Sequence, residues 1–120
     1  MDVKSRVFDY IKKKHRVKPD YPWDRYPSYA VFRHPDDEKW FCLMMNLPRS
    51  KLGLAGDGEV DVIDVKARVE LVGALRKRPG FFPAYHMNKE HWVTVVLDGS
   101  VPDSDVFEVI DDSFELTKNG

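Results

Sequence analysis

The sequence has few of the features that define several large classes of protein. Its only cysteine is Cys42, which rules out an internal disulfide and indicates a reducing compartment. The longest apolar runs, such as residues 40–45, are far too short to cross a bilayer, and residues 1–4 lack the apolar stretch of a signal peptide. We therefore expect a soluble, cytoplasmic protein with no membrane partner.

Motifs that carry catalytic or cofactor chemistry are also missing. The chain contains no G-x-G-x-x-G, no P-loop, no G-x-S-x-G and no H-E-x-x-H. His86, Glu90 and His91 spell H-x-x-x-E-H, which is one residue longer than the related zinc signature and lacks its helical context. Cys42 lies in an apolar run, where a small buried hydrophobe is expected rather than a nucleophile. The sequence thus predicts a non-enzymatic protein with no cofactor and no metal site.

Neither sign of charge is in excess over the whole chain. The formal net charge is −1, from 19 Lys and Arg against 20 Asp and Glu. The distribution is uneven, because residues 2–18 hold seven cations and two acids, whereas residues 98–118 hold seven acids and one cation. Two interpretations stay open: the terminal helices neutralise each other side by side, or the basic N-terminal helix is part of a nucleic-acid footprint.

The hydrophobic pattern predicts the order of the secondary-structure elements. Three helices are expected, beginning after Asp2, near Ala67 and after Pro102. Four strands are expected at residues 28–33, 39–47, 60–65 and 92–97. Residues 1–120 are long enough for one core and too short for two. We predict a single α+β domain, a two-layer antiparallel sheet with helices packed on one face.

The most distinctive stretch of the chain runs from Arg76 to Gly99. It opens with three consecutive cations at the end of the second predicted helix, where positive charge complements the helix dipole. Pro79 and Pro83 then keep the backbone out of helix. A polar and aromatic segment precedes the last predicted strand: Tyr85, His86, Met87, Asn88, Lys89, Glu90, His91 and Trp92. Trp92 is expected in the core, whereas the polar members either fasten the loop to its neighbours or form a binding surface.

The sequence PGFFPAYHMNKEHWVTVVLDGSVP, followed by an acidic helix and SFEL, resembles the MmcQ/YjbR-like family of small bacterial proteins. Looser similarity extends over nearly the whole chain and includes Tyr21-Pro22-Trp23 and Lys39-Trp40-Phe41. The resemblance implies a frataxin-like (CyaY-like) fold and a "double wing" module described as DNA-binding. It supplies no catalytic residue.

The resemblance and the cations together predict a monomeric DNA-binding module. Phosphate contacts are expected from Arg76, Lys77, Arg78 and Lys89, with Lys12 and Lys13 as a second track. His86, Asn88 and His91 would position the DNA or read its bases. Glu90 subtracts from the local positive potential.

The alternative is a small-molecule or protein-interaction module. An aromatic pocket would have as its walls Tyr21, Trp23, Tyr26, Phe81, Phe82 and Tyr85. Its polar anchors would be the donors around Tyr85, His86 and Asn88. Cations that share one exposed face would favour DNA, and convergence of these donors inside a cavity would favour the pocket.

Overall fold

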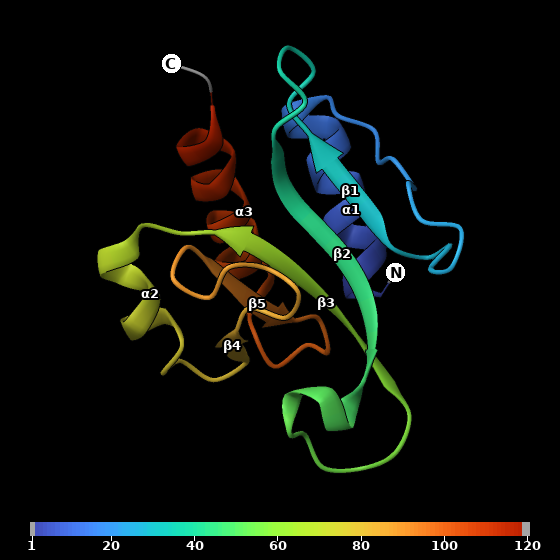
Figure 1. Ribbon diagram of the computed structural model, residues 1–120, viewed down its shortest axis with the longest axis vertical. Coiled ribbons are helices and arrows are strands. Elements are labelled where there is room, and N and C mark those ends of the chain that lie inside the picture. Colours follow the sequence, from blue (N-terminus) through green and yellow to red (C-terminus); the bar gives the residue numbers. More distant parts are fainter. Residues whose placement is uncertain (1, 119–120) are drawn as a thin grey trace.

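The computed structural model describes residues 2–118, which form a five-stranded antiparallel sheet with three α-helices (Figure 1). The elements are α1 (Val3–His15), β1 (Ala30–Arg33), β2 (Trp40–Pro48), the 3-10 helix η1 (Arg49–Leu52), β3 (Glu59–Lys66), α2 (Val69–Leu75), β4 (Phe81–Pro83), β5 (Trp92–Val96) and α3 (Asp103–Thr117). The strand order is β1-β2-β3-β5-β4, and every neighbouring pair is antiparallel. The predicted α+β class is confirmed.

The first helix begins where the sequence predicts. The Asp2 side chain accepts a hydrogen bond of 2.8 Å from the Ser5 backbone N–H, which satisfies one of the free donors at the helix N-terminus. Val3, Val7 and Ile11 follow at intervals of four residues and are buried against the sheet. The helix stops at Arg16, whose φ of 58° is left-handed.

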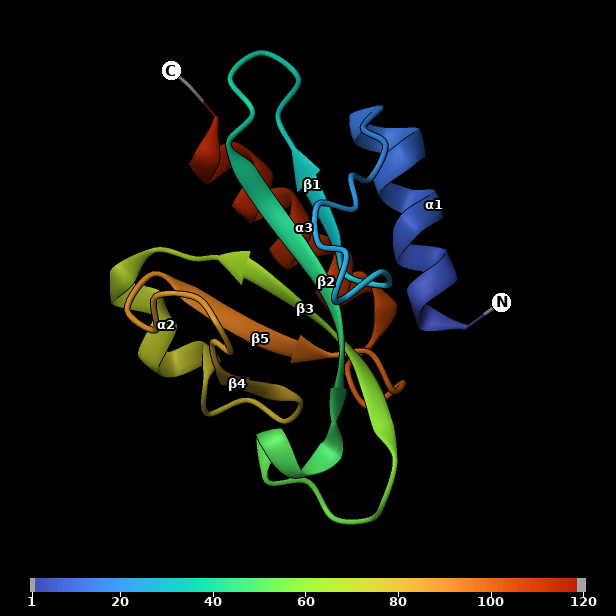
Figure 2. The same cartoon turned by 45° about the vertical axis from the view of Figure 1, so that its right-hand side comes forward.

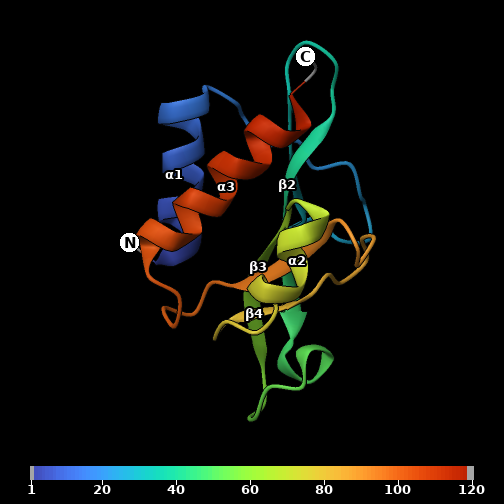
Figure 3. The same ribbon diagram turned by 90° about the vertical axis from the view of Figure 1, so that its left-hand side faces the viewer.

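The two faces of the sheet are covered differently. Figure 3 shows α1 and α3 together on one side of the sheet, where they pack on alternate residues of the central strands, such as Met44 and Ile63. The other face is covered without an α-helix, by segments that include Trp23, the loop 84–91 and Leu52 of η1. Residues 41–45 of β2 are therefore buried on both faces, as their uninterrupted apolar character predicts.

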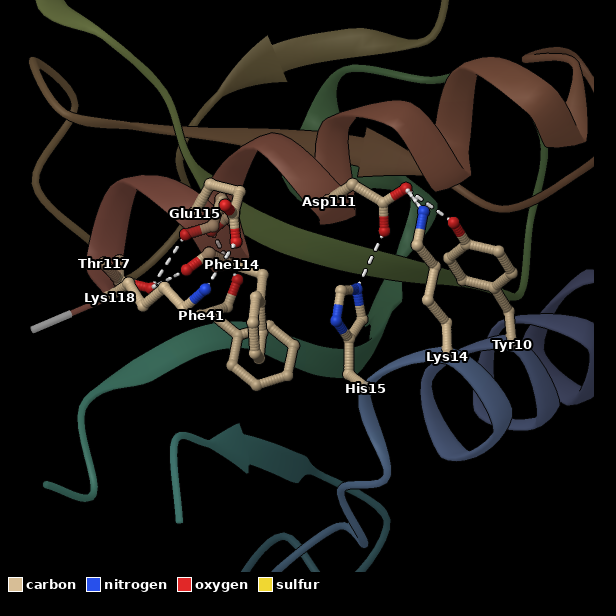
Figure 4. A network of polar contacts seen from close by, with 10 residues as sticks. Tyr10, Lys14, His15, Phe41, Asp111, Phe114, Glu115, Thr117 and Lys118 are labelled. Carbon is tan, nitrogen blue, oxygen red and sulfur yellow. Dashed lines mark hydrogen bonds and ion pairs between the residues drawn. The ribbon is translucent and has the colours of Figure 1, made fainter. Parts of the chain in front are cut away.

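Ion pairs join the two terminal helices. Arg6 Nε lies 2.6 Å from Asp103 Oδ2, and Lys14 Nζ lies 2.8 Å from Asp111 Oδ2. Asp111 also accepts a hydrogen bond from the Tyr10 hydroxyl and lies 2.8 Å from His15 Nε2 (Figure 4). Of the two interpretations of the uneven charge, mutual neutralisation is therefore confirmed for these cations.

The structure differs from the prediction between residues 67 and 83. The second helix is shorter than expected and leaves Leu71 exposed, so that only Val72 of α2 is fully buried. Residues 81–83, expected as loop, pair with β5 as the short edge strand β4. An edge strand tolerates Pro83 because one of its sides needs no ladder hydrogen bond.

None of the helices within residues 2–118 is both long and apolar enough to span a membrane.

Two glycines within residues 67–83 make a matched test. A methyl group on Gly80, whose φ is +84°, would lie 2.3 Å from Val101 Cγ2, whereas one on Gly73 would meet nothing within 4 Å. We expect Gly80→Ala to lower the free energy of unfolding by about 2–4 kcal/mol, through left-handed strain and overpacking. Gly73→Ala should raise it by up to about 1 kcal/mol, because alanine favours helix. Urea unfolding, monitored by circular dichroism, measures the free energy of unfolding of both variants. Equal changes in the two variants would contradict the backbone conformation described for these glycines.

Candidate nucleic-acid interface

Residues 76–78, the three cations that we expected to contact phosphates, lie in a tight turn that directly continues α2. The backbone N–H groups of Arg76, Lys77 and Arg78 donate to the carbonyls of residues 72, 74 and 75 at 3.0, 3.2 and 3.0 Å. Pro79 cannot donate to a further helical bond, and Gly80 turns the chain toward β4 with its positive φ. The turn holds the three cations close together beside the loop.

One hydrogen bond joins this turn to the polar loop. The Arg76 guanidinium donates to the backbone carbonyl of Lys89 at 3.4 Å. Arg76, Lys77 and Lys89 are all exposed, and within residues 2–118 none of them makes an ion pair. We call these three residues the basic surface. The structure therefore brings Lys89 next to a turn whose cation Arg76 lies 13 residues earlier in the sequence.

Arg78 points to a different neighbour. Its guanidinium lies 3.1 Å from an Asp105 carboxylate oxygen and 4.8 Å from the centre of the Phe81 ring. The charge of Arg78 is therefore largely compensated at the start of α3. The sequence analysis grouped Arg78 with Arg76 and Lys77 because the three are consecutive, and the distant partner Asp105 could not be recognised from the sequence.

Within the loop, Asn88 makes a turn. Its side-chain oxygen accepts a hydrogen bond of 2.8 Å from the Glu90 N–H, and its backbone carbonyl accepts from Trp92 at 2.9 Å. This is the local pattern by which asparagine stabilises tight turns. The carbonyl of His91 accepts from the Ala67 N–H at 2.9 Å and ties the loop to the end of β3. Part of the polar motif thus fastens the loop in place.

The two histidines of the motif differ in exposure. His86 is exposed and adopts a left-handed φ of 68°, with its ring edge-on to Tyr85 at 4.1 Å. His91 is half-buried. Of the two, His86 is therefore the more open to solvent. Trp92 is buried, as predicted.

A buried carboxylate beneath the loop was missed by the sequence reasoning. Asp64 of β3 is fully buried, and its Oδ1 accepts a 2.5 Å hydrogen bond from the Thr94 hydroxyl. That hydroxyl accepts in turn from the Tyr85 backbone N–H at 2.9 Å. Asp64 Oδ2 is buried with no hydrogen-bond partner among residues 2–118. The available signal was strand parity, because Asp64 must share a face with the buried Val62.

The environment of Asp64 favours its protonated form. Burial raises the pKa of Asp64 to about 7, although the Thr94 hydrogen bond and the positive charge of Lys89 act in the opposite direction. Lys89 of the basic surface is therefore electrostatically coupled to the carboxyl group beneath the loop.

The remaining predicted site residues lie elsewhere. Lys12 and Lys13 are exposed on α1, on the β1 side of the sheet, whereas α2 and the loop lie on the β5 side (Figures 1 and 2). Lys13 also pairs with Asp9 at 3.1 Å. The structure does not place these two lysines next to the basic surface.

The aromatic set of the alternative prediction is divided between the two faces. Phe81 belongs to the core cluster on the helical side, whereas Phe82, Tyr85 and Trp23 belong to the cluster on the other side. Tyr21 and Tyr26 are half exposed. The six rings therefore do not form the walls of one pocket.

Cys42 and the potential metal ligands are the remaining groups with chemical reactivity. Cys42 is fully buried, and burial raises the pKa of its thiol far above the ordinary value. In the described part of the chain, no group of three or more His, Cys, Asp and Glu side chains could hold a metal ion.

Known proteins are similar to this chain in sequence. A model of the YjbR family matches residues 12–116. The uncharacterized protein YyaQ of Bacillus subtilis (strain 168) is 42% identical over 118 residues, covering 98% of this chain and 100% of YyaQ. The uncharacterized protein YjbR of Escherichia coli (strain K12) is 40% identical over 58 residues, covering 48% of this chain and 49% of YjbR.

Solved structures extend the similarity to three dimensions. The crystal structure of a Pseudomonas syringae protein matches with a TM-score of 0.94 and 53% identity, covering 96% of this chain and 98% of that chain. The crystal structure of DR2400 from Deinococcus radiodurans matches with a TM-score of 0.71 and 24% identity, covering 97% and 78% of the two chains. The second match shows the fold alone.

The raised pKa of Asp64 predicts how stability depends on pH. Between the unfolded value near 3.8 and the folded value of about 7, the folded protein binds more protons than the unfolded chain. The contribution of Asp64 is thus fully present below the lower pKa, and is lost as pH rises through the upper one. We expect an effect on the order of 4 kcal/mol across this window, at about 1.4 kcal/mol per pKa unit.

Asp64→Asn mimics the protonated acid and should flatten this dependence between about pH 4 and pH 7, measured by urea unfolding with tryptophan fluorescence. Asp57→Asn, on the exposed β2–β3 connection, serves as the control and should keep the wild-type dependence. An unchanged slope in Asp64→Asn would show that Asp64 is ionised throughout.

Proposed function

The chain belongs to the YjbR family, and from this premise we propose that it binds DNA, without enzymatic activity, through the basic surface. The single observation that carries the proposal is the hydrogen bond from the Arg76 guanidinium to the Lys89 backbone carbonyl, which brings the turn with Arg76 and Lys77 next to the loop with Lys89. Such cations neutralise phosphates and release the counterions that surround DNA.

The surroundings of the basic surface support the same proposal. The loop is held by the Asn88 turn and by the hydrogen bond from Tyr85 to Thr94, so Lys89 is presented on a fixed backbone. Binding then orders few additional residues, which lowers its entropic cost. His86, three residues before Lys89, is exposed and can donate to a phosphate or a base edge.

Other cations of the chain are less suited to this role. Arg6, Lys14 and Arg78 are paired with carboxylates of α3. Lys12 and Lys13 remain a second track on α1, separate from the basic surface. The proposal therefore places the main phosphate contacts at Arg76, Lys77 and Lys89.

A salt series with single variants tests the proposal. Fluorescence anisotropy of a labelled duplex gives the dissociation constant at each salt concentration, and contacts from three cations predict a log–log slope of about −2 to −3. Lys89→Glu and Arg76→Glu should each make the slope shallower by roughly one unit. A flat salt dependence, or no binding at low salt, would refute DNA binding.

Two further variants locate the contact. Lys51→Glu is the matched control, because Lys51 is an exposed cation at the far tip of the β2–β3 hairpin. It should leave the slope unchanged. Lys12→Glu examines the second track, and we expect a smaller effect than for Lys89→Glu. A larger effect from Lys12→Glu would move the interface to α1.

A further inference from the structure

A groove of about 500 Å³ lies between α2 and α3. Its apolar lining includes Val65 and Val93 from neighbouring strands, Leu71 from α2, and Leu116 from α3. Leu71 and Leu116 are 50% and 38% exposed. The groove is open because α2, with seven residues, is too short to cover the flank of the 15-residue α3.

The two ends of the groove differ. At the start of α3 the ion pair between Arg78 and Asp105 bridges the two walls. Lys66 and Arg68, which precede α2, lie toward the last turns of α3, where the Lys66 N–H donates to Ser113 Oγ. The groove is thus an elongated apolar channel between two helices rather than a closed cavity.

The wall formed by α3 is acidic. Glu108, Asp112 and Glu115 all line the groove, at intervals of four and three residues that place them on one side of the helix. All three are exposed, and within residues 2–118 Glu108 and Asp112 make no ion pair. Glu115 reaches only the exposed Lys118, at 3.4 Å.

From this combination we propose that the groove between α2 and α3 is a docking site for a cationic amphipathic helix of a partner protein. An apolar stripe at positions i, i+3, i+4 and i+7 would cover Leu71 and Leu116, which is how amphipathic helices fill hydrophobic grooves. Lys or Arg on the flank facing α3 would meet Glu108, Asp112 and Glu115 and would favour this partner over an acidic one.

Other occupants fit this groove less well. Nucleic acid finds no continuous cationic surface here, because Lys66, Arg68 and Arg78 face the carboxylates of the α3 wall across the groove. A second copy offers no suitable helix within residues 2–118, because the apolar side of the cationic helix α1 is buried in its own core through Val3, Val7 and Ile11. A strand cannot extend the sheet here, because β3 and β5 are already paired with each other.

The test uses a synthetic amphipathic peptide of leucine, alanine and lysine, with leucine on one stripe and lysine on one flank. Titration into the ¹⁵N-labelled full chain should shift amide resonances of α2 and α3 in two-dimensional NMR spectra. A scrambled peptide of equal composition, and a peptide with glutamate in place of lysine, should each bind at least tenfold more weakly.

Variants of the protein complete the test. Asp112→Lys should weaken binding of the lysine peptide at least tenfold, and Leu71→Asn should do the same while leaving the spectrum of the free protein folded. Asp57→Lys, an exposed acid on the β2–β3 connection, is the matched control and should bind like wild type.

Three results would overturn the proposal. These are equal binding of the scrambled peptide, equal binding by Asp112→Lys, and no resonance shift up to about 1 mM peptide, the range of very weak complexes. Sedimentation of the protein alone adds a fourth: a dimer that Asp112→Lys dissociates would assign the groove to a second copy. DNA binding should survive in Asp112→Lys, and peptide binding in Lys89→Glu, which separates this proposal from the DNA proposal.

Discussion

The position of the loop 84–91 depends on the hydrogen bonds that run from the Tyr85 backbone through Thr94 to the buried Asp64. Burying an ionised carboxyl group costs free energy unless the group is paired with a cation. The hydrogen bonds that hold the loop therefore end on a group whose protonation state affects stability. Asp64 has no cation in direct contact among residues 2–118, but it is coupled to the charge of Lys89. The positive charge of the cation that the loop presents therefore acts on the group that anchors the loop, and lowers the pKa of Asp64 against the larger effect of burial.

The terminal helices show a different use of charge. Asp111 of α3 is contacted by Tyr10, Lys14 and His15 of α1, and the His15 ring stacks on Phe114 at 4.0 Å between ring centres. Although burial opposes the effect, hydrogen bonds from these groups hold the pKa of Asp111 below its usual range. The basic N-terminus and the acidic C-terminus thus stabilise the layer of helices over the sheet. The charges of Arg6, Lys14, Asp103 and Asp111 are therefore engaged within the domain.

Local sequence signals predicted the elements that depend on local chemistry. The Asp2 cap and the four-residue spacing of Val3, Val7 and Ile11 define α1 without any distant contact. β4 could not be predicted, because its three residues become a strand only by pairing with β5. Nor could the different roles of Arg76 and Arg78, since Asp105, which pairs with Arg78, lies 27 residues away in the sequence. The alternation of residues along β3 indicates that Asp64 shares a face of the sheet with Val62, but only the fold reveals that a loop covers this face.

The shortness of α2 connects the two surfaces that carry the functional proposals. Its early end at Leu75 leaves Arg76 and Lys77 in a solvent-exposed turn that reaches Lys89. The same two turns are too few to cover the acidic flank of α3 around Asp112. A net charge close to zero therefore conceals a basic surface after the end of α2 and a groove beside α2 whose α3 wall is acidic, and Arg78, which lines the groove, is paired with Asp105. Because opposite potentials recruit opposite partners, this arrangement allows DNA and a cationic helix to bind the same domain without competing for one site.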